Sequence, residues 1–367
     1  MDDALIERVR QIMQTSGLSQ ADFAELIATS PDRLSKSLKG VRKFTTTELA
    51  LAAQSAGTTV EWLLTGHHKA TPAIAARTAL AAAPSHEEIS DVVSRFSTAS
   101  EQLKMLAEPP RTMSNLPTLA KTTMYTDQAE QLAADALKMV REGGLNSTES
   151  DDLPALLEEV FSVDVAIVNL PGRLDGCAWQ TDTDRLIVLN RTSNWARQRF
   201  SLAHELGHIL ACDAQTLIAE EVPPHSSQIT EKRANSFAAS FLMPADEIHE
   251  KAQDVSDSRH FADLVNHFRV SPTSMAWRLV NLGLLPNGSV PKWQGVTAES
   301  CALTAGRPQL ISGERARSEA SRIPPRILNE HLEHFFKGVT SARPLAVLLE
   351  MPSRDVIDLL RPVEIQR

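Results

Sequence analysis

The sequence predicts a multi-domain protein that combines an all-α part with a mixed α+β part. A length of 367 residues is typical of two or three domains. Capped helical runs fill the N-terminal part, and three strand-like runs cluster between residues 163 and 190. We expect four parts: an all-α domain at 1–66, a helical connector and hinge at 67–122, an α+β domain with a small helical bundle at 123–286, and a small α/β module at 287–367.

Composition and charge limit the cellular setting. The net charge is −9, so any surface that binds nucleic acid must be local. The three cysteines, Cys177, Cys212 and Cys301, are scattered, which is typical of a reducing compartment. The N-terminus lacks the basic start and apolar run of a secretory signal, and no apolar stretch is long enough to span a bilayer. We expect a cytoplasmic protein with no membrane partner.

The N-terminal domain reads as five short helices. Gly17 is expected to end the first helix, and Ser19 to cap the second. Ser30 caps a third helix, in which Pro31 occupies the first turn, where its missing N–H costs nothing. Helices this short and this closely spaced must share one small core.

Residues 67–122 differ in composition from both flanks. Two helices are expected at about 72–83 and 86–107, followed by a Pro-rich hinge at 108–117. This connector is either a solvated linker or a helix that supports self-association.

The remaining chain alternates helices with a few strands. Helices are predicted from Tyr125 and from Asp151, followed by the strand-like runs "VDVAIVNL", "GCAWQ" and "RLIVLN". Two helices around a Val-Ser-Pro turn close the α+β domain near residue 285. The last part is expected to hold a helix, a strand ("PLAVLLE") and a further helix.

The stretch "RQRFSLAHELGHILACD" carries the clearest chemical signal. His204 and His208 lie four positions apart, so they share one face of a helix. Such a pair supplies two nitrogen ligands for zinc, and Glu205 beside them can take a proton from a metal-bound water. The alternative is a core helix that carries two structural histidines.

A third ligand is needed for a catalytic zinc site. Glu231 begins a second amphipathic helix, and Asn235 follows on the same face, in the outer shell of the site. Carboxylates at Asp213, Glu220 and Glu221 are rival ligands that fall in an expected loop. Zinc is the predicted metal, and manganese is the alternative because both accept a His/His/Glu set.

These residues resemble the ImmA/IrrE family of zinc-dependent metallopeptidases. The resemblance rests on "HELGHIL" followed by "EKRANSFAASFLMP" and covers about 125–285. It implies a zincin-like α+β fold with a helix-turn-helix-like tail. It also implies that His204, His208 and Glu231 bind the metal and that Glu205 is the catalytic base. Residues 287–367 lie outside this resemblance.

The run "LSQADFAELIATSPDRLSKSLKG" resembles the lambda-repressor-like, XRE-type helix-turn-helix domain. In that family the second helix enters the major groove of DNA. Five basic residues against one acid, Asp32, lie on this helix and its exit. The expected base contacts are Arg33 and Ser35, and the expected contacts to phosphate or the groove are Lys36, Lys39, Arg42 and Lys43. The alternative is a solvated charged helix face.

Together these features predict a DNA-binding regulator with an endopeptidase domain. The expected partners are a double-stranded DNA operator, a second copy of the chain, and a protein substrate. That substrate is a repressor-type protein or the chain itself, cut in response to stress such as DNA damage. Two alternatives stay open: a DNA-binding sensor with a structural, non-hydrolytic metal, and one component of a toxin–antitoxin pair.

Overall fold

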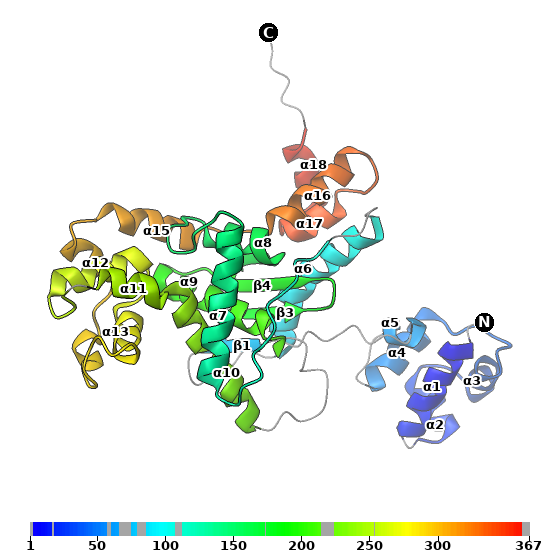
Figure 1. The fold of residues 1–367 in the computed structure, drawn as a ribbon. Coiled ribbons are helices and arrows are strands. Elements are labelled where there is room, and N and C mark those ends of the chain that lie inside the picture. The colour runs from blue at the N-terminus through cyan, green and yellow to red at the C-terminus, as the bar shows by residue number, and fades with distance from the viewer. Residues whose placement is uncertain are drawn as a thin grey trace, which may run out of the picture. The chain divides into compact units, whose positions relative to one another are not determined.

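The structure is a computed structural model that describes residues 3–16, 18–56, 60–65, 75–78, 86–106, 112–172, 174–213, 224–252 and 254–361. The chain divides into two compact units, Met1–Thr71 and Pro72–Arg367. Figure 1 labels their elements in chain order. No helix in the described ranges is long and apolar enough to cross a membrane.

The N-terminal unit is all-α. Its helices are α1 (Asp3–Thr15), α2 (Gln20–Leu26), α3 (Pro31–Leu38), α4 (Thr46–Ser55) and α5 (Val60–Thr65). Ser19, Ser30 and Thr45 accept backbone hydrogen bonds as the N-caps of α2, α3 and α4. All five helices contribute to one small core that includes the fully buried Phe23 and Leu34.

A buried ion pair joins the exit of α3 to the start of α4. Arg42 donates to both carboxylate oxygens of Glu48, at 2.9 and 3.0 Å, and to the hydroxyl of Ser37 at 3.0 Å. Glu48 also accepts from the backbone N–H of Thr45 at 2.8 Å, which completes a capping box. The sequence predicts that Arg42 contacts DNA, whereas the structure gives its guanidinium this role inside the unit.

The second unit is built on a four-stranded sheet in the order β1-β3-β4-β2. Its strands are β1 (Ala75–Thr78), β2 (Asp164–Val168), β3 (Leu174–Gln180) and β4 (Arg185–Asn190). β2 and β4 are parallel, whereas β1 and β4 both run antiparallel to β3. The strand-like runs of the sequence therefore form neighbouring strands of one sheet.

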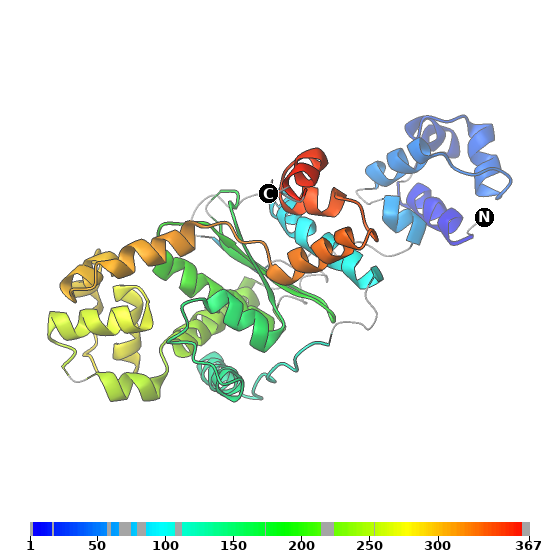
Figure 2. The ribbon, with the colours of Figure 1, turned by 90° about the horizontal axis from the view of Figure 1, so that it is seen from above.

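Both faces of this sheet are covered. Val165, Ile167 and Ile187 join the core that also holds α7 (Tyr125–Glu142), α8 (Leu153–Phe161), α9 (Trp195–Leu210) and α10 (Pro224–Leu242). Ala166 and Val188 face a second core with α6 (His86–Leu106) and α16 (Pro325–Phe336). Figure 2 shows the sheet between these two groups of helices. Burial on both faces explains why the strands read as nearly continuous apolar runs.

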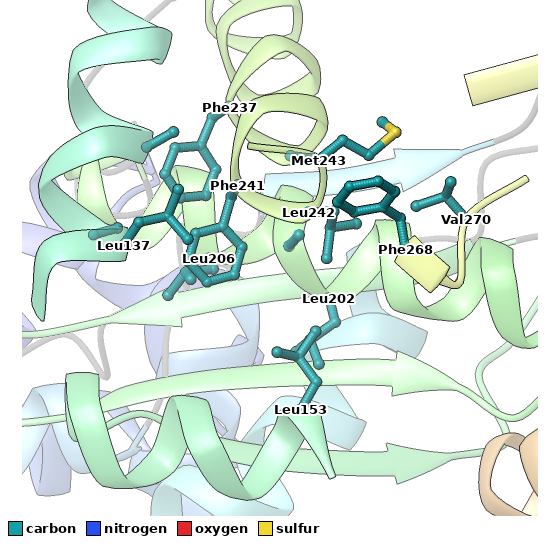
Figure 3. Packing of buried hydrophobic residues seen from close by; sticks show 14 of the residues in the cluster. Leu137, Leu153, Leu202, Leu206, Phe237, Phe241, Leu242, Met243, Phe268 and Val270 are labelled. Atoms are coloured by element: carbon teal, nitrogen blue, oxygen red, sulfur yellow. The ribbon is translucent and has the colours of Figure 1, made fainter. Parts of the chain in front are cut away.

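The first of these cores surrounds the packing of α10 against α9 and α7. Phe237 and Phe241 of α10 stack with ring centroids 5.6 Å apart. Figure 3 shows both rings between Leu137 of α7 and Leu206 of α9. The two helices that carry the candidate metal ligands therefore pack together in one apolar core that includes both rings.

The segment expected to be a connector belongs to the second unit. The sequence predicts a helix at 72–83, whereas residues 75–78 form strand β1 beside β3. Helix α6 has the predicted position, but its apolar face, including Val93 and Phe96, lies in the core against the sheet. That face is covered within the chain, so α6 is not a solvated linker. Self-association through its other face stays a prediction.

The C-terminal part also differs from its prediction. Residues 343–348, expected as a strand, form helix α17, whose Leu345 and Leu348 are buried. A short apolar run fits a strand and a buried helix equally well, so its period does not decide between them. After the bundle of α12 (Ser258–Phe268) and α13 (Pro272–Asn281), the regular elements of the described residues are helices, apart from one bridge between Ile167 and Arg322.

The remaining helices are α11 (Ala245–Lys251), α14 (Ala298–Thr304), α15 (Gln309–Glu319), α17 (Arg343–Leu348) and α18 (Ser353–Leu359), with a 3-10 turn at Val290–Trp293. α14 packs on α12, α15 on α9, and both α16 and α17 on α6. The expected α/β module is thus a set of helices spread over the second unit.

The ion pair of Glu48 predicts an acid-sensitive N-terminal unit. Burial alone would raise the pKa of Glu48, but hydrogen bonds from Arg42 and Thr45 lower this pKa from 4.5 to about 2. A lowered folded-state pKa stabilises the unit above pH 4.5, and that contribution is lost as the pH falls toward 2. We expect residues 1–71 to lose about 3 kcal/mol of unfolding free energy over this range. The loss is measured by urea unfolding through the fluorescence of Trp62, the one tryptophan in that segment.

Glu48→Gln should be less stable at neutral pH and should lose most of this pH dependence. The matched control is Glu7→Gln, because Glu7 pairs with Arg10 at the exposed surface. Equal pH profiles for the wild type and Glu48→Gln would contradict the assignment.

Candidate metal centre

Helix α9 places the two histidines side by side in the interior. Asn194 caps its start by accepting from the backbone N–H of Arg197 at 3.1 Å. His204 and His208 are 0% and 2% exposed, and their Nε2 atoms lie 3.1 Å apart. The spacing of four residues brings both rings to one face, as the sequence predicts.

Helix α10 supplies the third group. The sequence expects this helix to begin at Glu231, whereas it begins at Pro224, so Glu231 lies inside it. A Cβ at Gly207 would lie 2.9 Å from Cδ1 of Phe237 and 3.4 Å from Cα of Ala234. Glycine at 207 therefore lets α10 approach α9 closely enough for a carboxylate to reach both imidazoles.

The three side chains converge on one point. Nε2 of His204 and Nε2 of His208 lie 3.3 Å from Oε2 and Oε1 of Glu231, respectively. All three ligand atoms lie within 4.8 Å of one another. Donors at the corners of a zinc tetrahedron are about 3.3 Å apart when each lies about 2.0–2.1 Å from the metal. The donor set and its spacing therefore fit a zinc ion.

Outer contacts fix the orientation of each imidazole. Nδ1 of His204 lies 3.2 Å from the amide oxygen of Asn235, and Nδ1 of His208 lies 3.1 Å from a carboxylate oxygen of Asp213. Both oxygens are acceptors, so each Nδ1 carries the proton and each Nε2 presents a lone pair. Arg233 pairs with Asp213 and donates to Gln128 at 3.0 Å, which ties the site to α7.

The charges of the site favour a cation. Burial opposes protonation of His208, but hydrogen bonds to Asp213 and Glu231 raise its pKa to about 10. Burial would raise the pKa of Glu231, but its hydrogen bonds to His204 and His208 hold it well below the usual range. These acidic groups therefore stabilise a positive charge at the cluster. A bound divalent ion would provide that charge while both imidazoles stay neutral.

Glu205 follows His204 on α9 and lies against strand β3 of the sheet. It is 0% exposed. Its Cγ would lie 3.5 Å from a Cβ at Gly176 of β3, and burial together with the charge of Glu205 raises the pKa of the Cys177 thiol. Burial of a carboxylate is costly unless the carboxylate is paired, hydrogen-bonded or close to a cation.

The structure places one of the three rival ligands that the sequence offers. Asp213 contacts His208 instead of joining the three ligand atoms. Glu220 and Glu221 lie outside the described residues. The roles of Arg233, Gln128 and Gly176 could not be predicted from the sequence, because nothing in a linear pattern links them to α9.

The residues predicted to contact DNA lie on α3 and the turn that follows it. Exposed side chains are those of Arg33, Lys36, Lys39 and Lys43, whereas Ser35 is half-buried. Lys36 is engaged by Asp32 at 2.7 Å. Among the described residues of α3 and the turn after it, Arg33, Lys39 and Lys43 are therefore exposed basic residues outside any ion pair, whereas the exposed Lys36 pairs with Asp32.

With this geometry in place, known proteins provide a comparison. Residues 171–280 match the family of IrrE N-terminal-like domains. The matched range runs from just before β3 to the end region of α13 and contains all three metal-ligand candidates. The second unit thus contains an IrrE N-terminal-like domain.

A curated relative supports the same assignment. The chain is 29% identical over 140 residues to the radiation response metalloprotease IrrE of Deinococcus radiodurans. The match covers 37% of this chain and 42% of the relative, so the chain spans less than half the length of that protein. The likeness concerns the metallopeptidase part, and the N-terminal helices lie outside the matched family range.

The geometry predicts a graded series of metal affinities. We expect His204→Ala and Glu231→Ala to lose bound zinc, because each removes a donor from the cluster. Asn235→Ala and Asp213→Ala should weaken zinc binding about 10- to 100-fold, because each frees the orientation of one imidazole. Glu205→Gln should keep a full complement of zinc. Metal content after dialysis against a graded chelator measures the series.

Matched controls come from α11 in the same unit. His249→Ala and Glu250→Ala remove residues that are exposed, so both should bind zinc like the wild type. Retention of zinc by Glu231→Ala at wild-type affinity would contradict the ligand assignment.

Proposed function

We propose that the second unit is a zinc-dependent endopeptidase. The observation that carries this proposal is the buried carboxylate of Glu205 next to a His/His/Glu cluster and against the backbone of β3. A purely structural metal site gains nothing from such a carboxylate, whereas hydrolysis requires a base at this place. The match to IrrE N-terminal-like domains supports the same reaction class.

The residues of the site have distinct tasks in this proposal. His204, His208 and Glu231 would hold the zinc, which when bound lowers the pKa of a water and polarises a carbonyl group. Glu205 accepts the proton of the attacking water and later delivers it to the leaving amine. Asn235 and Asp213 keep the imidazoles in the tautomer that leaves Nε2 available to the metal. Manganese is an alternative metal because the same donors accept it.

The substrate we propose is a repressor-type protein, cut in response to stress such as DNA damage. The name of the relative, a radiation response metalloprotease, supports this choice. Cleavage of the chain itself is the other candidate. The Pro-rich hinge is a poor site for it: the backbone at Ser114 accepts from Arg185 at 3.0 Å and donates to Ser162 at 3.1 Å, which ties the segment down. Residues 108–111 of the hinge lie outside the described residues.

We further propose that the N-terminal unit binds double-stranded operator DNA as a homodimer in the cytoplasm. Supporting this proposal, α2 packs on α3, and the turn between them holds Ala28 at a φ of 51°. Arg33 at the start of α3 is free to meet base edges, and Lys39 and Lys43 are placed for phosphates. Ser35 and Lys36 are weaker candidates because one is half-buried and the other is paired with Asp32.

Two other functions use the same residues. A DNA-binding sensor with a structural metal would need the three ligands but not Glu205. One component of a toxin–antitoxin pair would share both units, and it would differ in the partner protein that it binds. The buried carboxylate favours the enzyme over the sensor.

Loss of the base should abolish cleavage while the metal stays bound. We expect zinc-loaded wild-type protein to cut members of an unstructured peptide library, and Glu205→Gln to be at least about 100-fold slower, because general-base catalysis contributes that much or more. Mass spectrometry of the cleaved peptides measures both rates.

Glu250→Gln is the matched control, because that exposed glutamate lies on α11; it should cut at the wild-type rate. Equal rates for the wild type and Glu205→Gln, with zinc bound in both, would favour the sensor.

Salt dependence tests the DNA proposal. Each lysine that contacts a phosphate adds about one unit to the slope of log binding constant against log salt. We expect Lys39→Ala and Lys43→Ala each to reduce that slope by about one for any duplex, and Arg33→Ala to reduce discrimination between sequences. Fluorescence anisotropy with duplexes selected from a random pool measures both effects.

Lys138→Ala, an exposed lysine on α7 of the second unit, is the control and should leave the slope unchanged. A slope insensitive to Lys39 and Lys43 would contradict DNA binding through α3.

A further inference from the structure

Strand β3 passes beside Glu205, with its face at Gly176 toward α9. α9 packs against β3. A Cβ at Gly176 would lie 2.9 Å from Cδ2 of Leu189, 3.1 Å from the carbonyl oxygen of Val188 and 3.5 Å from Cγ of Glu205. Glycine at this position therefore lets the backbone of β3 lie directly against the candidate base.

This edge has the properties of a peptide-binding surface. β4 pairs with one side of β3 over residues 176–180, which leaves the opposite side for another strand. The edge of a sheet presents N–H and C=O groups that bind an extended chain through backbone hydrogen bonds. A peptide held there would run past Gly176, and hence past Glu205.

In this structure the chain itself occupies that edge. β1 runs antiparallel to β3, with Arg77 opposite Gly176 and Ala76 opposite Cys177. β1 also contacts α9, the helix that carries the metal-ligand candidates. Figure 1 shows β1 at the border of the sheet, next to β3. The backbone of residues 75–78 therefore lies where a peptide in trans would bind.

The pairing of β1 with β3 is short and irregular. It has four residues, Ala-Ala-Arg-Thr, and the register shifts between Arg77 and Thr78. Alanine is depleted in strands, and a bulge interrupts the ladder of hydrogen bonds. By contrast, β2 and β4 pair through five residues from the buried interior. The backbone pairing of β1 is therefore shorter and less regular than the pairing of β2 with β4.

We propose that the outer edge of β3 is the docking surface for an extended polypeptide substrate, and that β1 occupies it in cis as a competitor. A regulatory role for β1 rests on the proposed endopeptidase function. The competition between β1 and a peptide is a binding equilibrium, which can be measured without cleavage. A tethered strand acts at an effective concentration of about millimolar, so a weak pairing still opposes a peptide in trans. Release of β1 opens the edge to that peptide.

Peptide binding to the full chain tests the competition. The probe is a fluorescently labelled synthetic peptide of residues 72–83, added to the zinc-loaded Glu205→Gln protein so that no cleavage interferes. Ala76→Pro removes a backbone N–H from β1 and disfavours its pairing. We expect this variant to bind the peptide at least about tenfold more tightly than its parent in fluorescence anisotropy.

The matched control is Ala81→Pro, which places the same residue beyond the end of β1 and should bind the peptide like the parent. Equal affinities for Ala76→Pro and the parent, or binding to neither, would overturn the proposal. Zinc content, measured for each protein, shows that the metal site is folded.

A second variant tests the same idea in the opposite direction. Ala76→Cys introduces a thiol opposite Cys177 in the antiparallel register, at a separation that a disulfide can span. With the exposed Cys212 changed to serine, oxidised glutathione should lock β1 in place and abolish peptide binding, and dithiothreitol should restore it. Peptide binding that is unchanged in the locked protein, or failure of the disulfide to form, would overturn the placement of β1.

The two proposals fail separately. An enzyme that cuts nothing would end the proposed function, yet the competition between β1 and the peptide would still be measured in Glu205→Gln. An active enzyme whose Glu205→Gln form binds peptide equally with β1 open or locked would end only this inference.

Discussion

The structure of the second unit depends on the close approach of two helices around charged groups. Two imidazole nitrogens lie 3.1 Å apart, and a carboxylate lies 3.3 Å from both. In the tautomer that Asn235 and Asp213 favour, both nitrogens carry lone pairs. Such lone pairs repel unless a positive charge lies between them. The fold supplies the tight contact at Gly207 and the stacked phenylalanines of α10, and these leave the three donors little freedom to move apart. A divalent cation resolves this constraint with the donors already in place.

The same constraint organises the surroundings. Asp213 and Asn235 orient the two rings, and Arg233 links Asp213 to α7, so that the helix behind the site holds the site in register. On the other flank, Gly176 lets β3 reach Glu205. The sheet therefore does more than support α9: β3 lies against Glu205, and β1 pairs with the outer edge of β3.

The candidate site was largely predictable from the sequence because it is local. A spacing of four residues puts His204 and His208 on one helix face, and a second amphipathic helix with the family pattern pointed to Glu231. Asn235 followed from the same helical period. Asp213 was misjudged as a rival ligand, because its distance from the Nε2 atoms depends on how α9 ends. The pairing of Arg42 with Glu48 was not predictable, because a basic residue beside a recognition helix has the same sequence signal whether it faces solvent or a buried carboxylate.

The long-range parts of the fold were not predictable in this way. Residues 75–78 have alanine-rich, helix-favouring composition, and only pairing with β3 makes them a strand. α6 reads as a linker helix because its apolar stripe does not reveal the sheet face that it covers. Residues 343–348 have an apolar run too short for its period to distinguish a strand from a helix. In each case a tertiary contact decided the structure.

The coordination of the metal tests the central claim most directly. X-ray absorption spectroscopy of the zinc-reconstituted full chain should show two imidazole nitrogens and oxygen ligands at about 2.0–2.2 Å, with no sulfur. A sulfur scatterer at about 2.3 Å, which would implicate a cysteine, or a spectrum without two imidazoles, would contradict the account.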